Sequence, residues 1–335
     1  MYQEHKSISI IFIVIPVVLF FASFLIGRYP VTPVEVIMTL LSPLNPNLAI
    51  SDTITGVVFN IRLPRIIAAM LVGASLAVVG GTFQSIFRNP LVSPDILGVS
   101  TGAGFGAALS ILLSLGNYIT QIFAFIFGLI SVTISYFISR VYKYSGILVL
   151  VLSGMAVSSL FGALISSIKF LADPNQKLPE ITFWLMGSLS SVNMDSLIPV
   201  FVTIFIGLAI LLLLRWRLNI LAMGDEESQS LGINTDRLRI ILIFISTFIT
   251  AAAVCISGVI GWVGLIVPHM TRIITGPDNR ILLPASLSFG ASFLLFIDNL
   301  ARVLFTVELP IGILTAIIGA PVFLFLLKKG YNDWN

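Results

Sequence analysis

The sequence has few of the side chains that carry most protein chemistry. Its 335 residues include one cysteine, two histidines and only 10% charged residues. A single cysteine, Cys255, excludes an intrachain disulfide and a metal cluster built on cysteine, and its apolar surroundings predict a buried thiol. His269 has no second histidine at ligand spacing, so we expect a hydrogen-bonded structural role for it rather than a metal site.

The motifs of catalysis are also missing. No Ser/His/Asp constellation, no pair of intramembrane carboxylates and no zinc-binding helix motif can be assembled, and there is no P-loop. The sequence therefore predicts no catalytic residue, no metal site and no cofactor held by this chain. The net charge of +3 gives no reason to expect a nucleic acid partner, because basic residues beside a membrane and anionic lipid account for it.

Apolar residues are what the chain has in abundance. They make up 57% of it, and the mean hydropathy is +1.07, far from the composition of soluble domains. A helix needs about 20 apolar residues to cross the hydrocarbon layer, and backbone groups in lipid must be paired internally. We therefore expect an all-α polytopic membrane protein with residues 1–335 in one transmembrane domain. About ten apolar stretches are present, near residues 8–27, 63–86, 95–114, 118–139, 146–169, 195–214, 237–262, 264–275, 281–304 and 310–327.

The distribution of basic residues predicts the orientation. Residues 24–28 offer no small-x-small cleavage site, so the first stretch is interpreted as a retained helix. With ten spans and a cytoplasmic amino terminus, two-thirds of the Lys and Arg residues lie inside, as the positive-inside rule requires. Both termini then face the cytoplasm. The inner residues are Lys6, Arg88, Arg140, Lys143, Arg215, Arg217, Arg237, Arg239, Arg272, Arg280, Lys328 and Lys329.

Three arginines are exceptions to that rule. Arg62, Arg65 and Arg302 fall at outer helix ends, where charge is not needed for topology and is costly in lipid. Arg62 and Arg65 together favour a docking site for carboxylates, although snorkelling to the headgroups is the alternative. Asp298 lies one helical turn before Arg302, so an intrahelical pair and an outward-facing role both stay open.

Small residues recur at the spacing that lets helices cross closely. Gly98, Gly102 and Gly106 form overlapping small-xxx-small patterns. The same letters partly imitate a dinucleotide-binding loop, but no strand precedes them and no acidic residue follows at the expected distance. Close helix packing is the better interpretation.

Two polar segments interrupt the apolar pattern. Residues 172–188 lie on the outer side and end in a short amphipathic piece with Trp184, interpreted as a half-buried helix bordering a pathway rather than an ordinary loop. Residues 223–239 lie on the inner side between two long apolar runs. They are interpreted as the attachment point for another protein, with a solvated loop as the alternative.

Several motifs in order resemble one family. They are Arg62-Leu-Pro-Arg65, residues 73–80 and 84–103, Leu231-Gly-Ile233, residues 261–272, Asp298-Asn-Leu-Ala-Arg302 and residues 308–321. From about residue 10 to residue 328 the chain resembles the permease subunits of ABC importers for iron-siderophores, haem and vitamin B12, the FecCD type.

The resemblance implies a type II ABC importer permease fold with ten helices and short outer and coupling helices. It implies a bacterial cytoplasmic membrane and a dimer with a second permease subunit, identical or homologous, around a two-fold path. A dimer of ATPase subunits that binds ATP and Mg²⁺ is expected inside, and a substrate-binding protein, extracellular or periplasmic, outside.

Site residues are carried over from the same resemblance. The coupling loop, about 220–236, is expected to act through Gly224, Glu227, Leu231 and Gly232. Arg62, Arg65 and Arg302 match positions that receive acidic residues of the binding protein. Ile181, Trp184 and Ser188 match the gate-forming segment.

The function expected is therefore import of a ferric siderophore by alternating access. Haem and cobalamin are the less favoured cargoes. The alternative is a secondary transporter coupled to ions or protons. Such a protein usually has ionisable residues at mid-membrane, and Asp298 is the main example here, with a neighbour that can neutralise it.

Overall fold

A computed structural model describes residues 2–45, 51–141 and 147–332. Lys143, counted above on the inner side, lies outside these ranges. The described residues form helices joined by loops, and none of them belongs to a strand. The all-α class predicted from the composition is confirmed.

The long helices follow the predicted apolar stretches one for one. They are α1 (Tyr2–Ser23), α4 (Leu63–Ile86), α5 (Val99–Leu112), α6 (Asn117–Val141), α7 (Ile147–Leu171), α9 (Met194–Met223), α11 (Thr235–Ser257), α12 (Val263–Thr275), α13 (Asn279–Val303) and α14 (Ile311–Asn332). In the described residues, six helices are long and apolar enough to cross a membrane, counting α4 from Asp52. Four shorter apolar helices lie in α1, α5, α12 and α14.

Shorter elements connect these helices. They are α2 (Pro33–Leu41), α3 (Asp52–Gly56), the π-helical turn η1 (Val57–Arg62), the 3₁₀ turn η2 (Pro94–Leu97), α8 (Lys177–Leu185) and α10 (Asp225–Ser230). The predicted outer amphipathic piece is α8, and the polar inner segment contains α10. Thr32 caps α2 in a reciprocal capping box with Glu35.

The predicted boundaries were approximate, and several differ from the helix ends by four residues or more. Two of these differences have identifiable reasons. The third stretch was expected to begin at residue 95, but α5 begins at Val99 because η2 ends at Gly98, whose φ of +87° stops the turn. The sixth stretch was expected to end at residue 214, but α9 continues to Met223. Arg215, Arg217 and Asn219 are too polar for the apolar stretch but do not break a helix, so α9 continues past residue 214. Gly224, with a φ of +138°, ends it.

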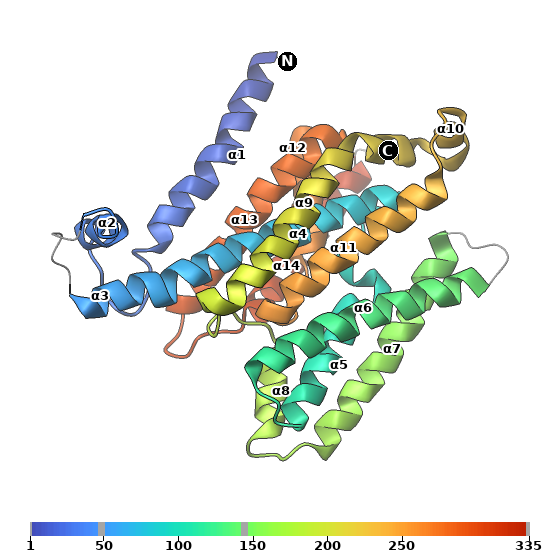
Figure 1. Cartoon of the computed structure of the whole chain (residues 1–335). Coiled ribbons are helices and arrows are strands. Elements are labelled where there is room, and N and C mark those ends of the chain that lie inside the picture. The colour runs from blue at the N-terminus through green and yellow to red at the C-terminus, as the bar shows by residue number, and fades with distance from the viewer. Residues whose placement is uncertain (1, 46–50, 142–146, 333–335) are drawn as a thin grey trace.

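The helix α4 lies at the centre of the fold. It packs against α13, α12, α11 and α9, and nearly all its residues from Pro64 to Ile86 are buried. A helix that is apolar on every side is expected to be enclosed in this way. The helices α5, α6, α7 and α8 form a second group beside it (Figure 1), with α5 packed on α6, α7 and α8.

Glycines sit where helix backbones meet. A Cβ on Gly73 of α4 would overlap the backbone carbonyl of Gly290 of α13, and a Cβ on Gly290 would overlap that of Gly73. In the same way, Gly102 and Gly106 of α5 meet backbone carbonyls of α6. The predicted role of the small residues in close packing is confirmed, since a larger side chain would push the helices apart.

Replacing Gly290 by valine should therefore destabilise the chain by about 1–3 kcal/mol, the usual cost of overpacking a filled core. Thermal unfolding of the purified protein in detergent, followed by circular dichroism, measures the loss. Gly162→Val is the matched control, because Gly162 is also helical but has open space where its Cβ would lie. Equal stability of the two variants would contradict this packing.

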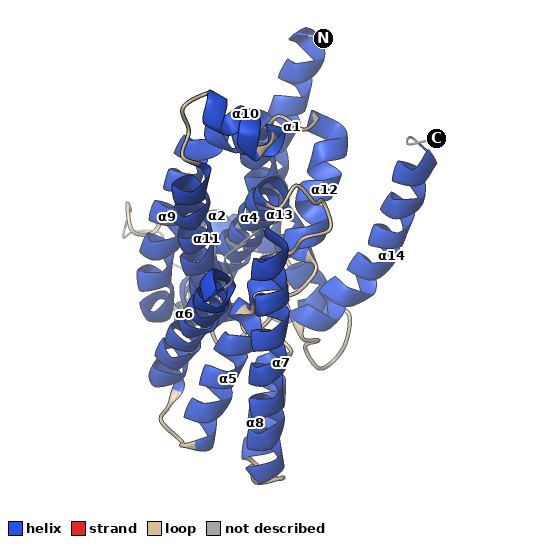
Figure 2. Cartoon of the chain, turned by 90° about the vertical axis from the view of Figure 1, so that its right-hand side faces the viewer, coloured by secondary structure: helices blue, strands red, loops and turns tan. Residues whose placement is uncertain are grey.

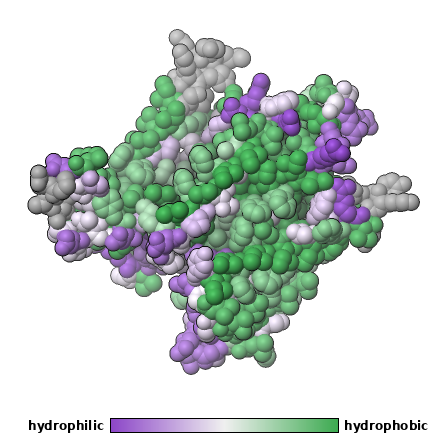
Figure 3. All heavy atoms as spheres, viewed as in Figure 1, coloured by the Kyte–Doolittle hydropathy of each residue, from purple (hydrophilic) through white to green (hydrophobic). Residues whose placement is uncertain are grey.

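The two ends of the bundle differ. Figures 1 and 2 place the start of α1, the last turns of α14 and α10 at one end, and α8 at the opposite end. Large apolar side chains remain exposed on the flanks, among them Phe170 at 89% and Leu213 at 75%. Figure 3 shows apolar residues spread over the helix flanks and hydrophilic ones gathered near the ends. Apolar flanks between hydrophilic ends are typical of a protein surface that contacts lipid.

Candidate functional site

The inner polar segment folds into a compact helix and turn. Gly224 ends α9 and starts α10, and a Cβ there would overlap the carboxylate of Glu227. Ser228 Oγ donates to the carbonyl of Ile220 at 2.8 Å, which anchors α10 to the last turn of α9. Gly232, with a φ of +77°, then turns the chain toward α11. The glycines are needed here because other residues rarely adopt these conformations.

Two apolar side chains are exposed on this segment. Met223, the last residue of α9, is 64% exposed, and Leu231 is 60% exposed at the end of α10, where Glu227 is exposed in the same short helix. An exposed leucine on a polar projection, held by a rigid turn, is typical of an anchor for a partner's groove. The structure thus brings Gly224, Glu227, Leu231 and Gly232 together, and their coupling role stays a prediction.

A hydrogen-bonded cap holds the same end of the bundle. Asn219 Nδ2 of α9 donates to Asp278 Oδ1 at 2.6 Å, and Asn279 Nδ2 donates to Asn219 Oδ1 at 2.9 Å. Hydrogen bonds from Arg280, and then from Asn219, lower the pKa of Asp278 from 3.8 to about 2. Because the folded-state pKa is lowered, this stabilisation is fully present above the ordinary pKa and is lost only as the pH falls toward 2. The cap therefore does not titrate near neutral pH.

The three outer arginines surround one cavity. Arg62 of η1, Arg65 of α4 and Arg302 of α13 line a space of about 200 Å³, together with Arg28 and Glu308. Their side chains are not free on the surface, however, since the three residues are only 4%, 6% and 5% exposed. Snorkelling to the headgroups does not describe them in this structure.

Partners within the chain hold these arginines. Arg65 Nε lies 2.9 Å from Asp298 Oδ1, and Arg65 Nη1 lies 2.8 Å from Glu308 Oε2. Arg302 Nε lies 2.9 Å from Asp298 Oδ2, so of the two roles left open for Asp298 and Arg302 the intrahelical pair is present. Arg62 donates only to the carbonyls of Phe24 and Tyr29.

With Arg28, four guanidinium groups at this cavity face two carboxylates, Asp298 and Glu308, which leaves an excess positive charge there. An added carboxylate would be attracted there. Docking of a binding protein through these arginines stays a prediction. Because the arginines are buried, an acidic side chain of that protein would have to reach them through the cavity. The sequence analysis gave Glu308 no role in this site, although its position between the last two apolar stretches already placed it on the outer side.

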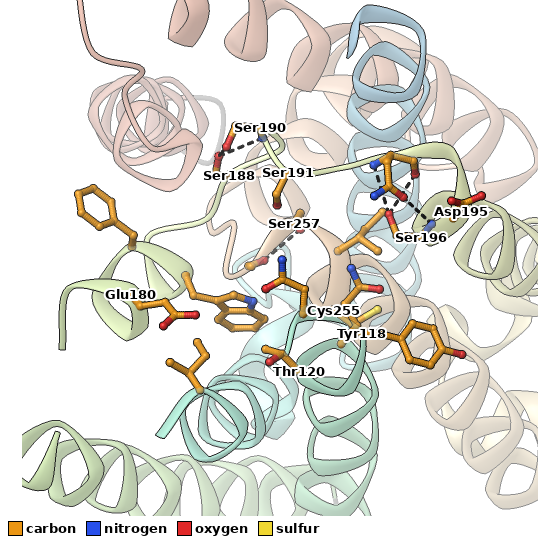
Figure 4. A pocket seen from close by; sticks show the side chains of 18 residues that line it. Tyr118, Thr120, Glu180, Ser188, Ser190, Ser191, Asp195, Ser196, Cys255 and Ser257 are labelled. Carbon is orange, nitrogen blue, oxygen red and sulfur yellow. Dashed lines mark hydrogen bonds between the residues drawn. The ribbon is translucent and has the colours of Figure 1, made fainter. Parts of the chain in front are cut away.

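A larger cavity lies beside α8, as Figure 4 shows. Its volume is about 460 Å³. Hydroxyl, amide, indole and carboxyl side chains from α6, α8, the loop between α8 and α9, the start of α9 and the end of α11 line it: Asn117, Tyr118, Thr120, Gln121, Glu180, Trp184, Ser188, Ser190, Ser191, Asn193, Asp195, Ser196 and Ser257. Such a lining offers hydrogen bonds to water or to a polar solute.

The predicted gate residues divide between two environments. Trp184 and Ser188 line the 460 Å³ cavity. Ile181 does not, because it is fully buried in a small apolar cluster with Ala108 and Ile168. One face of α8 packs on α5 and the other faces the cavity. The sequence did not show on which of these faces Ile181 lies.

The chain that follows α8 is clamped between two long helices. Ser188 N donates to the carbonyl of Ser257 at the end of α11, at 2.8 Å. Ile311 N and Gly312 N, at the start of α14, donate to the carbonyls of Gly187 and Met186 at 2.9 and 3.1 Å. A movement of α11 or α14 would therefore pull directly on α8.

The remaining chemistry-bearing residues add no site. Cys255 is buried, as predicted. Nδ1 of His269 is buried and has no hydrogen-bond partner in the part of the chain that the structure describes, so the expected hydrogen-bonded role is not seen at that atom. Across the described ranges, no group of three His, Cys, Asp or Glu residues could hold a metal ion.

Comparisons with known proteins agree on one family. The model of the FecCD transport family matches residues 14–329. Molybdate import system permease protein MolB of Haemophilus influenzae is 41% identical over 91% of both chains. A probable iron chelatin transport system permease protein of Helicobacter pylori is 42% identical over 83% of this chain and 84% of its own. A solved structure described as an inward-facing, metal-chelate type ABC transporter superposes with a TM-score of 0.85 at 39% identity, covering 95% of this chain and 97% of that one.

Proposed function

Because this chain belongs to the FecCD transport family, we propose that it moves a ferric siderophore across a bacterial cytoplasmic membrane by alternating access. Its role as the permease of an ABC importer follows from the family and from its relatives, and it is a membrane protein. As a transport permease it is not itself an enzyme. The observation that carries the proposal is the match to a metal-chelate type transporter over nearly the whole chain.

The alternative, a secondary transporter, is not favoured. Asp298, which would have to exchange an ion or proton, is fully buried and paired with both Arg65 and Arg302. Both of its carboxylate oxygens are occupied by guanidinium groups, so no open site for a coupling ion remains at this carboxylate.

ATP hydrolysis belongs, in our proposal, to a separate dimer of ATPase subunits on the inner side, which alone binds ATP and Mg²⁺. The segment from Gly224 to Gly232, with Leu231 as its anchor, would enter a groove on that ATPase. Two permease subunits, identical or homologous, would form the path between them. The exposed apolar flanks leave room for both lipid and this second subunit.

On the outer side, a substrate-binding protein would dock over the arginine cavity, placing its carboxylates near Arg62, Arg65 and Arg302. The excess positive charge of that cavity supports this position. The gate would be α8 with Trp184 and Ser188, because the clamp of this segment between α11 and α14 connects it to helices that reach the inner end.

The cargo is the least constrained part of the proposal. A ferric siderophore is favoured over haem and cobalamin, while the similarity to a molybdate permease adds a small oxyanion to the choices. Co-purification without crosslinking, followed by mass spectrometry, should recover an ATPase, a second permease and a bound chelate. Recovery of molybdate instead would overturn the choice of cargo, and recovery of the chain alone would count against the assembly.

Labelling should place α10 in the cytoplasm and the chain before α8 outside. Ser230 of α10 and Asn175 before α8 are both exposed, and Cys255, the single native cysteine, is replaced by serine because it lines the 460 Å³ cavity. In intact cells, a membrane-impermeant maleimide should label Asn175→Cys, and it should label Ser230→Cys only after permeabilisation. The reverse pattern would show that the orientation is wrong.

A further inference from the structure

Asp225, the first residue of α10, binds arginines from two other elements. Its Oδ1 atom lies 2.5 Å from Arg88 Nη2 and 2.7 Å from Arg239 Nη2. Arg88 lies two residues after α4 ends, and Arg239 lies in the first turns of α11. One carboxylate therefore joins the inner ends of α4 and α11 to α10.

Arg239 depends on this contact. Its side chain is only 13% exposed, and its other acidic neighbour, Asp236, is 3.9 Å away and 71% exposed. Its Nε atom is buried and has no hydrogen-bond partner among the described residues. An ion pair with a largely buried arginine and a shared acceptor is held more firmly than an isolated pair on the surface.

Arg88 reaches Asp225 from a backbone conformation that is unfavourable for arginine. Its φ is +49°, in the left-handed region. The turn is held from both sides, since Phe87 N donates to the carbonyl of Phe83 at 2.8 Å and Asn89 N donates to that of Gln84 at 3.1 Å. Strain of this kind persists where the surroundings fix it, often at functional sites.

The two helices joined by Asp225 lead to the centre of the molecule. The helix α4 packs against α9, α11, α12 and α13, and α4 and α11 also contact one another. The chain itself connects α10 only to α9 and α11. Asp225 adds a direct connection from α10 to α4, which the covalent path does not provide.

We infer that Asp225 is the positioning residue that transmits displacement of α10 to α4 and α11, through its shared ion pairs with Arg88 and Arg239. The inference rests on the proposed coupling role of α10. Asp52, the first residue of α3, is exposed, lies outside the coupling segment and forms no ion pair with any described residue, so its replacement removes the same charge without touching the link.

The test uses the assembled transporter, with its ATPase and binding protein, in proteoliposomes. Uptake and ATP hydrolysis are measured together for Asp225→Asn, Arg88→Gln, the double variant and the control Asp52→Asn. Asp225→Asn and Arg88→Gln should each lower the uptake per ATP hydrolysed about tenfold, while Asp52→Asn leaves it unchanged. The double variant should be no worse than Asp225→Asn, because Arg88→Gln removes one of the two ion pairs that Asp225→Asn already removes.

A second readout covers variants that assemble poorly. Hydrogen exchange of the α10 backbone amides should rise in Asp225→Asn and Arg88→Gln and return toward wild type in Asp225→Glu. Uptake per ATP equal to the control, or losses that multiply in the double variant, would overturn the inference while leaving the coupling role intact. Absence of ATP-driven uptake in the wild type would instead reject the proposed function, and the inference with it.

Discussion

Leu231→Glu should abolish ATP-driven uptake while the permease remains in the membrane. Leu231 is 60% exposed on an otherwise polar projection, so its environment without a partner is water, and a charge there costs the free permease little. In a partner's apolar groove the same charge would be buried without a counterion. Loss of one such anchor typically weakens binding by about 2 kcal/mol or more, roughly 30-fold.

The comparison that isolates this effect is Asn175→Glu, which adds the same charge at an exposed position outside α10, before α8. It should retain uptake and co-purify with the ATPase. Gly232→Glu should behave like Leu231→Glu, because a φ of +77° strains any side chain there. Uptake that persists in Leu231→Glu would mean that this segment is not the coupling element.

Asp298→Asn should destabilise the protein by about 3–5 kcal/mol, the usual cost of removing one partner of a buried ion pair. Asp298 is fully buried, and its two oxygens serve Arg65 and Arg302. Without it, two nearly buried guanidinium groups would face each other with only Glu308 to balance them. Thermal unfolding in detergent and the yield from membranes both measure the effect.

The double variant Asp298→Asn/Arg302→Gln separates charge from shape. It should recover part of the lost stability, because it removes one unpaired charge together with the carboxylate. A stable Asp298→Asn protein that has lost transport would instead assign Asp298 to the coupling of an ion or proton, as the secondary-transporter alternative requires.

The sequence predicted the helices well because the membrane imposes a simple rule. An apolar stretch of the right length has to be a helix, and each predicted stretch corresponds to one. The end of α9 was predicted too early because the rule applies only to the apolar part of a helix. Beyond residue 214 the sequence is more polar, and the helix continues until Gly224 ends it.

The candidate sites were only partly predictable. Arg62, Arg65 and Arg302 were found from their breach of the charge rule. The pair of Arg302 with Asp298 was one of two roles left open, but the partners of Arg62 and Arg65 were not predicted. Arg65 and Asp298 are 233 positions apart, and only the packing of α4 on α13 brings them together. Asp225 was missed for the same reason, since nothing local shows that Arg88 turns back to meet it.

Uptake by proteoliposomes tests the central claim most directly. The chain is reconstituted with its ATPase and binding protein, and entry of labelled ferric siderophore is followed with Mg-ATP on the ATPase side or with an imposed proton or sodium gradient. We predict uptake that needs the ATPase and ATP and is unaffected by ionophores. Uptake driven by an ion gradient through this chain without the ATPase would contradict the account.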